Sequence, residues 1–269
     1  MANFEYQIFL AKKGLFKQAF HLAHRIFPKG GTCLEFGVFR GNSYLYQAMY
    51  IKEKYTNSKL AGFDSWMGLP DENPSVWRPR LHAKGEYCST KDVVLEKLSK
   101  AGLTNDPRLS FVDGFFSESC TLELQKKFND IIFINIDVDI YQSTIELLDF
   151  VKPLLRPGVI LYWDDWKDPR ATHEKSWGEH LAWDHWSAKN TDVKAELVET
   201  NWVNQRFTVI TEANGKKLSA MALTVEQVKS MADELETSTG KLVKSLVKSK
   251  PVSGFLNFSF QMWGRIKPL

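Results

Sequence analysis

Short apolar runs alternate along this chain with longer segments of mixed polarity. Apolar runs rich in Ile, Val and Phe and bounded by turn residues are typical of buried strands in a parallel sheet. They predict strands at 32–38, 59–64, 109–114, 131–137 and 158–166. The mixed segments predict helices at 3–27, 41–54, 90–98, 117–128, 143–155 and 172–187. A closing antiparallel pair is predicted at 196–201 and 206–211, so the pattern as a whole predicts an α/β fold with a seven-stranded, doubly wound sheet.

The alternation stops near Gly215. Residues 224–248 predict an amphipathic helix, and residues 241–263 combine Lys with Phe and Trp. We therefore expect one domain at 1–214, opened by an N-terminal helix, and a helical C-terminal appendage at 215–269. The basic and aromatic stretch 241–263 leaves two alternatives open: peripheral contact with an anionic membrane, or packing on the core or on a second copy in a homo-oligomer.

Composition narrows the class of protein. The chain has 269 residues, 43% hydrophobic and 25% charged, which suits one large α/β domain with a real core. A net charge of +3 and a pI near 8.6 are too mild to indicate a nucleic-acid partner. Three widely spaced cysteines form no disulfide or metal pattern, and we see no signal peptide or membrane span. We expect a cytoplasmic protein.

Two predicted strands end in pairs of carboxylates. Asp137 and Asp139 follow one apolar run, and Asp164 and Asp165 follow the next. Open α/β sheets bind ligands at the carboxyl ends of their strands, so the pairs should lie within reach of each other. Clustered carboxylates repel one another unless a cation neutralises them, and an all-oxygen cluster suits Mg²⁺.

The first predicted strand ends in an acid followed by a glycine turn. Glu35 precedes Gly37, and Gly41 opens the next helix. This layout is typical of nucleotide-binding folds, but the glycine spacing is not G-x-G-x-x-G, which favours a less phosphorylated nucleotide-like ligand over a dinucleotide. Asp64 ends the second strand, where an acid receives ribose hydroxyls. Asp113 ends the third, where it would contact an adenine amino group or begin a turn.

Five segments, in this order, resemble the macrocin-type (TylF-like) O-methyltransferases: 34–43, 62–70, 111–114, 136–144 and 164–166. The resemblance covers residues 30–211 and implies a Rossmann-like class I methyltransferase sheet. It also implies the cofactor S-adenosylmethionine, a magnesium ion, and methylation of a hydroxyl on a sugar or glycosylated small molecule.

The resemblance also implies roles for individual residues. Glu35, Gly37 and Gly41 would line the methionine end of the cofactor, Asp64 would hold the ribose, and Asp113 the adenine. The full set of cofactor-binding residues expected is Glu35, Phe36, Gly37, Gly41, Ser43, Asp64, Ser65, Asp113, Gly114 and Asp137.

The metal ligands that the resemblance implies are Asp137, Asp164 and Asp165. Asp137 is preferred to Asp139 because it lies nearer the strand end. A bound divalent ion lowers the pKa of a substrate hydroxyl, and a neighbouring base then removes its proton. Asp137 and His180 are the catalytic candidates, and metal-bound carboxylates are an alternative base.

Two other functions compete with the methyltransferase. A nicotinamide-dependent oxidoreductase is disfavoured by the glycine spacing and by Ile145, which stands where a Tyr-x-x-x-Lys pair beginning at Tyr141 would need Lys. A non-catalytic, membrane-peripheral scaffold protein would predict a degraded metal site, yet all four acids are present.

Overall fold

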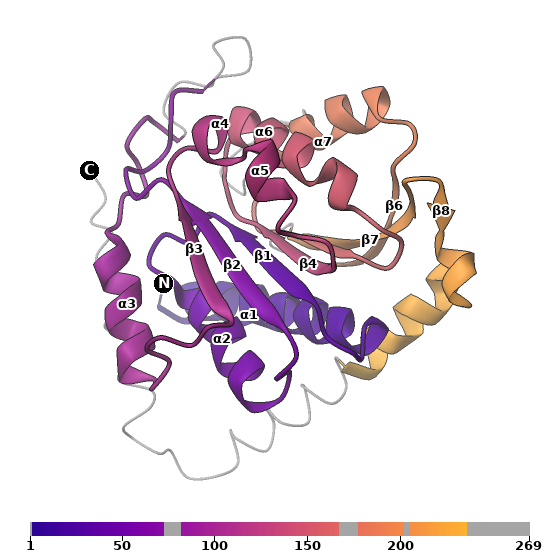
Figure 1. Cartoon of the computed structure of the whole chain (residues 1–269), viewed down its shortest axis with the longest axis horizontal. Helices are drawn as coiled ribbons and strands as arrows, with labels where there is room; N and C mark the ends of the chain where they lie inside the picture. The colour runs from indigo at the N-terminus through magenta and orange to yellow at the C-terminus, as the bar shows by residue number, and fades with distance from the viewer. Residues whose placement is uncertain (1, 73–81, 167–176, 202–204, 236–269) are drawn as a thin grey trace.

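The computed structural model describes residues 2–72, 82–166, 177–201 and 205–235, with the side chains of residues 2–12 left aside. These residues form one eight-stranded sheet with helices on both faces (Figure 1). Five neighbouring strands are parallel: β3 (Leu109–Asp113), β2 (Lys59–Asp64), β1 (Thr32–Phe36), β4 (Ile131–Ile136) and β5 (Ile160–Trp163). The antiparallel strands β7 (Arg206–Ala213) and β6 (Lys194–Thr200) complete the order β3-β2-β1-β4-β5-β7-β6. The predicted doubly wound sheet is confirmed, and the two-residue strand β8 (Lys216–Lys217), which the sequence did not predict, pairs with β7.

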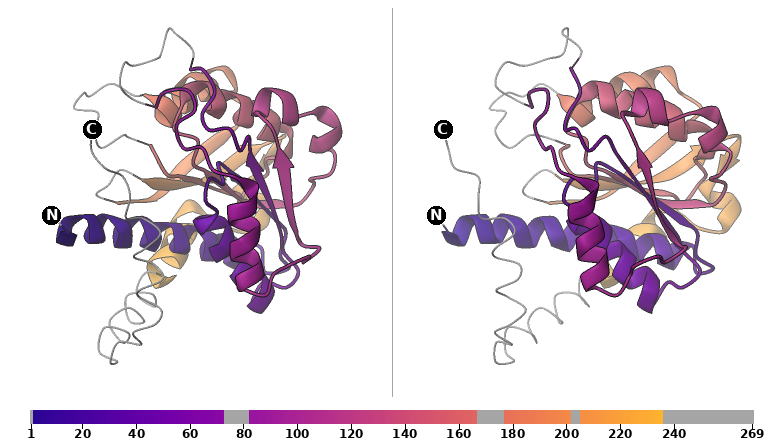
Figure 2. Two further views of the ribbon diagram at one scale, coloured as in Figure 1. Left: turned by 90° about the vertical axis from the view of Figure 1, so that its left-hand side faces the viewer. Right: turned by 60° about the vertical axis from the view of Figure 1, so that its left-hand side comes forward.

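The sheet divides the core into two apolar clusters, and helices cover each of them. The first face carries α1 (Ala2–Ile26), α2 (Asn42–Glu53) and α3 (Lys91–Lys100). The second carries α4 (Phe116–Ser119), α5 (Leu122–Gln125), α6 (Tyr141–Val151) and α7 (Gly178–Lys189). Figure 2 shows α1 running beneath the sheet, with its N-terminal end reaching beyond the strands. Every residue of β1 and β4 is buried, as expected for central strands covered on both faces.

Three predicted helices differ from the structure. Residues 117–128 form two short helices, because the Thr121 side chain accepts from the Leu124 amide at 3.2 Å and caps a new helix. Helix α6 begins at Tyr141 and gives way after Val151 to a 3₁₀ turn, Lys152–Leu154, because Pro153 has no N–H to donate. Helix α7 begins at Gly178 after the extended Trp177, so Trp177 interrupts the helix predicted over 172–187; residues 172–176 lie outside the described residues.

Residues beyond β8 pack against α1. A 3₁₀ turn, Leu218–Met221, leads to a helix at 225–235, whose Val228 and Ala232 are buried in the same cluster as α1. Gln18 donates to the carbonyl of Ala232 at 3.0 Å, and Arg25 pairs with Glu234 at 2.5 Å. The remainder of the predicted appendage, 236–269, including the basic and aromatic stretch 241–263, lies outside the described residues.

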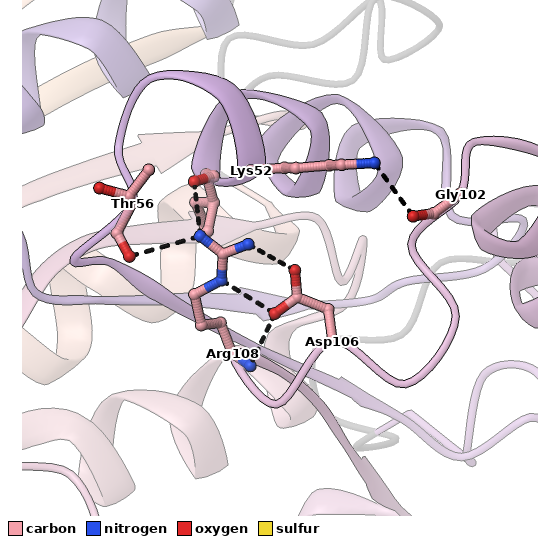
Figure 3. A network of polar contacts seen from close by, with 6 residues as sticks. Lys52, Thr56, Gly102, Asp106 and Arg108 are labelled. Carbon is pink, nitrogen blue, oxygen red and sulfur yellow. Dashed lines mark hydrogen bonds and ion pairs between the residues drawn. The ribbon is translucent and has the colours of Figure 1, made fainter.

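A polar network fixes the amino-terminal edge of the sheet (Figure 3). Arg108 donates to both carboxylate oxygens of Asp106, at 2.9 and 2.6 Å, and to the carbonyls of Ile51 and Thr56. The bonds to Ile51 and Thr56 hold the turn before β3 against the end of α2, and the bonds from Arg108 lower the pKa of Asp106. Over the described ranges, no helix combines the length and apolarity that a membrane span needs.

Candidate active site

The glycine turn after β1 lies at the carboxyl edge of the sheet, in close contact with two other elements. Gly37 has φ +86°, and a Cβ placed on it would lie 1.8 Å from the carbonyl oxygen of Asp137. Gly41 has φ +68°, and a Cβ there would lie 2.6 Å from Val94 of α3. Both positions therefore require glycine, for backbone conformation and for space. The turn is held against the end of β4 on one side and against α3 on the other.

Asp64, at the end of β2, binds this turn directly. One carboxylate oxygen accepts from the amides of Val38 at 2.9 Å and Phe39 at 2.7 Å, and the other accepts from the amide of Trp66 at 2.7 Å. Burial raises the pKa of Asp64, although all three N–H bonds act to lower it. The structure thus places the predicted ribose-binding acid beside the predicted cofactor turn.

Glu35 is completely buried beneath the turn. It accepts from the Ser43 hydroxyl at 2.8 Å and from the Gln47 side-chain amide, both on α2. Burial, the largest cause, raises the pKa of Glu35 to about 8 against these hydrogen bonds and that of Asn135. Glu35 therefore joins β1 to α2, and direct contact of Glu35 and Ser43 with a cofactor stays a prediction.

The remaining cofactor candidates lie along the same edge. Phe36 is buried and stacks on Phe63, with ring centroids 4.4 Å apart. Ser65 donates to the carbonyl of Gly68 at 3.0 Å in the turn after β2. Gly114 has φ +114° and donates its amide to the carbonyl of Asp64 at 3.1 Å. These contacts place the ends of β2 and β3 beside the turn without assigning a ligand.

Asp113, at the end of β3, has two partners that the sequence did not indicate. Lys91 of α3 donates to both carboxylate oxygens at 2.9 and 2.8 Å, and the Trp66 indole N–H donates at 2.8 Å. Desolvation acts to raise the pKa of Asp113, but the hydrogen bonds and charge of Lys91, with Trp66, hold it below its usual value. The carboxylate expected to meet adenine is thus ionised and faces a cation.

Three carboxylates converge where β4 and β5 end. One oxygen each from Asp137, Asp164 and Asp165 lies within 4.8 Å of the others, and all three residues are half-buried. The strands β4 and β5 are adjacent and parallel, which brings residues that follow them to one place. Three oxygen donors at this spacing fit a hard divalent cation such as Mg²⁺.

Asp139 lies outside this group of three. It has φ +62° and is 9% exposed, and its Oδ1 is 3.3 Å from Nδ1 of His82. Burial, followed by the charges of Asp165 and Glu179, raises its pKa well above the usual value. The geometry thus groups Asp137, and not Asp139, with the second acid pair.

Asp164 is oriented by two neutral donors. The Tyr162 hydroxyl donates to Oδ1 at 3.1 Å, and the buried Gln205 side-chain amide donates to the same oxygen. Burial, followed by the charge of Asp164, raises the pKa of Tyr162, so this hydroxyl stays a donor. Gln205 precedes β7, and nothing in its sequence neighbourhood indicated a role at this site.

Glu179 is a further site residue that the sequence did not indicate. This fully buried carboxylate of α7 accepts from the amide of Val138 at 3.1 Å and from the amide of Asp165 at 3.2 Å. Burial and the charge of Asp165 raise its pKa well above the usual value. In the sequence it is one Glu in the first turn of a helix, where a negative charge is favoured without any site.

His180 lies on α7, next to Glu179. Its ring stacks on Trp166 with centroids 4.3 Å apart, and its Nε2 is 3.4 Å from Oδ2 of Asp184. The guanidinium of Arg206 lies 3.9 Å from the centroid of the same Trp166 ring. His180 therefore packs against Trp166, the residue that follows Asp165, and its role as a base stays a prediction.

Comparison with known families identifies the chain. The model of the family described as Macrocin-O-methyltransferase (TylF) matches residues 24–228. The chain belongs to the macrocin O-methyltransferase family. This confirms the predicted family and the enzyme class, an S-adenosylmethionine-dependent O-methyltransferase, and does not favour the oxidoreductase and scaffold alternatives.

Solved structures of other methyltransferases show the same fold. The O-methyltransferase NovP superposes with a TM-score of 0.60 at 18% identity, over 72% of this chain and 78% of NovP. CalS11, a calicheamicin methyltransferase, gives a TM-score of 0.56 at 20% identity, over 78% of this chain and 80% of CalS11. A search of curated protein sequences gave no match.

Proposed function

We propose that this macrocin-family enzyme transfers the methyl group of S-adenosylmethionine to a hydroxyl of a sugar or glycosylated small molecule, with Mg²⁺ held by Asp137, Asp164 and Asp165. The observation that carries the proposal is the convergence of these three carboxylates at the same sheet edge as the glycine turn. The match to the macrocin O-methyltransferase family supports this acceptor class.

The cofactor would lie along the ends of β1, β2 and β3. An ionised carboxylate has about four acceptor positions, and Asp64 uses three of them for backbone amides. The remaining capacity is suited to ribose hydroxyls. Asp113 likewise uses three of its positions, for Trp66 and Lys91, and its remaining capacity is suited to the adenine amino group. The backbone of the glycine turn would approach the methionine end of the cofactor.

The acceptor hydroxyl would lie beside the three carboxylates. A bound divalent cation there would orient the hydroxyl and lower its pKa. Tyr162 and Gln205 hold Asp164 in place for this role. The hydroxyl proton passes to a base, for which Asp137 and His180 are our candidates, while the oxygen takes the methyl group from the sulfonium sulfur and S-adenosylhomocysteine leaves.

We extend the proposal to the chain as a whole. Residues 1–214 would carry the activity, and residues 215–269 would form the appendage, with 241–263 contacting a membrane surface or a second subunit. The enzyme would act in the cytoplasm on a small-molecule or glycan acceptor. It would have no nucleic-acid partner.

Calorimetric titration of S-adenosylmethionine into the wild type and Asp164→Ala, with and without Mg²⁺, tests the proposal. We expect cofactor binding in both proteins, because Asp164 lies in the acid cluster and not on the glycine turn. An acceptor screen with sugars and glycosides would follow. Absence of cofactor binding by the wild type under every condition would contradict the proposal.

A further inference from the structure

We infer that Glu179 is a positioning residue that fixes the separation of the two strand ends carrying the acid cluster, and thereby sets the affinity of the site for a divalent cation. This inference rests on the cation site in the proposed function. It assigns the role to the side chain of Glu179, which is outside the cluster of three carboxylates.

The two hydrogen bonds of Glu179 join the backbones that carry the acids. Its Oε1 accepts from Val138, the residue after Asp137, and its Oε2 accepts from the amide of Asp165 itself. The regular pairing of β4 with β5 ends at Ile136 and Trp163, and the amide of Asp164 still bonds to the carbonyl of Ile136 at 3.0 Å. Glu179 therefore bridges the strand ends just beyond their last shared backbone bond.

The bridge requires two acceptors on one side chain. Glu179 is fully buried, so removing its carboxylate would leave both amides without a hydrogen-bond partner and would destabilise the folded protein. A carboxylate offers two accepting oxygens, whereas the amide of Gln offers one acceptor and one NH₂ donor. A Gln side chain in the same place would therefore turn its NH₂ group toward the amide of Val138 or of Asp165.

The start of α7 is built to approach the cluster closely. Gly178 has φ +50°, and a Cβ there would lie 2.4 Å from the carbonyl oxygen of Asp139. Trp177, just before it, stacks on His82 with ring centroids 5.0 Å apart. Close docking at Gly178 places the first turn of α7 where the Glu179 carboxylate reaches both strand ends.

A general stabilising role makes a different prediction. A Glu in the first turn of a helix stabilises that helix through its charge, without needing particular partners. Burying this charge beside Asp165 costs free energy, which the two amide bonds partly offset. If Glu179 contributed stability alone, its replacement would lower the melting temperature and leave cation affinity unchanged. The positioning role predicts a loss of cation affinity in a protein that remains folded.

The test is calorimetric titration of MgCl₂ into the full chain saturated with S-adenosylhomocysteine. Glu179→Gln is compared with the wild type and with Glu123→Gln, which makes the same change at an exposed first-turn position of α5. Thermal unfolding in EDTA verifies folding. We expect Glu179→Gln to weaken Mg²⁺ binding about tenfold or more, the range found when groups that orient metal ligands are removed. Glu123→Gln should bind Mg²⁺ as the wild type does.

Glu179→Asp provides a second variant if Glu179→Gln does not fold. Its carboxylate keeps both acceptors but is shorter by one methylene, and it should weaken Mg²⁺ binding in the same direction. Wild-type Mg²⁺ affinity in either folded variant would overturn the inference. Absence of Mg²⁺ binding by the wild type would overturn it together with the cation site of the proposed function, while retained S-adenosylhomocysteine binding would leave the methyltransferase assignment standing.

Discussion

Gly37 lies directly against the backbone of Asp137, so that a Cβ at position 37 would lie 1.8 Å from the Asp137 carbonyl oxygen. The two residues follow neighbouring strands, β1 and β4, and belong to different parts of the site. One carries the predicted cofactor turn and the other the acid cluster. Their contact fixes the distance between the two parts and leaves no space for a side chain at position 37.

Gly37→Ala should therefore be costly. The new methyl group would combine a left-handed backbone with a backbone clash, and we expect a loss of about 3 kcal/mol or more in the free energy of unfolding. Gly215→Ala is the matched control, since Gly215 has φ +71° and open space around it and should cost about 1 kcal/mol. Urea unfolding measures both, and equal losses would contradict the contact.

Asp64→Asn should weaken cofactor binding and destabilise the turn. One oxygen of Asp64 accepts from both Val38 and Phe39, and the other accepts from Trp66. An Asn side chain would turn its NH₂ group toward at least one amide donor. We expect the Kd for S-adenosylmethionine to rise about tenfold or more, a loss of about 1.4 kcal/mol. Asp71→Asn, at an exposed ion pair with Lys84, should leave the Kd unchanged, and an unchanged Kd in Asp64→Asn would contradict the assignment.

Glu35 predicts an unusual pH dependence of stability. Its folded pKa is about 8, above the unfolded value of about 4.3, so the folded state binds the extra proton between these values. The contribution of Glu35 to stability is therefore present at low pH and is lost as pH rises toward 8. From pH 5 to pH 8 the wild type should therefore lose stability relative to Glu35→Gln, measured as the difference in unfolding free energy between the two proteins. A constant difference over that range would show that Glu35 is ionised throughout.

The buried His24 of α1 predicts the opposite change of stability with pH. The His24 ring stacks on Tyr55 with ring centroids 3.8 Å apart, and its two nitrogens form hydrogen bonds with the Phe20 carbonyl and the Ser58 hydroxyl. Burial lowers the pKa of His24 to about 4. Because the folded pKa lies below the unfolded value of about 6.5, stability falls as pH decreases from 6.5 to 4, by about 3 kcal/mol. His24→Gln should flatten this part of the pH profile of unfolding free energy. A slope in His24→Gln equal to that of the wild type would contradict the account.

Local pattern was sufficient for the sheet and for the convergence of the two acid pairs at one of its edges. The apolar runs of β4 and β5 are long enough to be recognised as buried strands, and residues that follow adjacent parallel strands meet at one edge. The two acid pairs could thus be placed together before the structure was known, whereas the preference for Asp137 over Asp139 came with the family resemblance and its place nearer the strand end. The break near Thr121 was missed because a side-chain cap competes locally with helix continuation.

Contacts between distant elements could not be predicted in this way. Glu179 and Gln205 reach the acid cluster through the docking of α7 and the approach to β7, and Lys91 reaches Asp113 through the packing of α3. Each depends on tertiary positions that no periodicity encodes. The sequence therefore indicated the acids at this site, whereas the groups that orient them became visible in the folded chain.

The most direct test of the central claim is transfer of a labelled methyl group from S-adenosylmethionine to a panel of sugars and glycosides. The wild type would be assayed with EDTA and after Mg²⁺ is restored. We predict a methylated hydroxyl product that disappears in EDTA and returns with Mg²⁺, and no such return in Asp164→Ala at the same Mg²⁺ concentration. Product formation at equal rates with EDTA and with Mg²⁺ would contradict the role of the acid cluster.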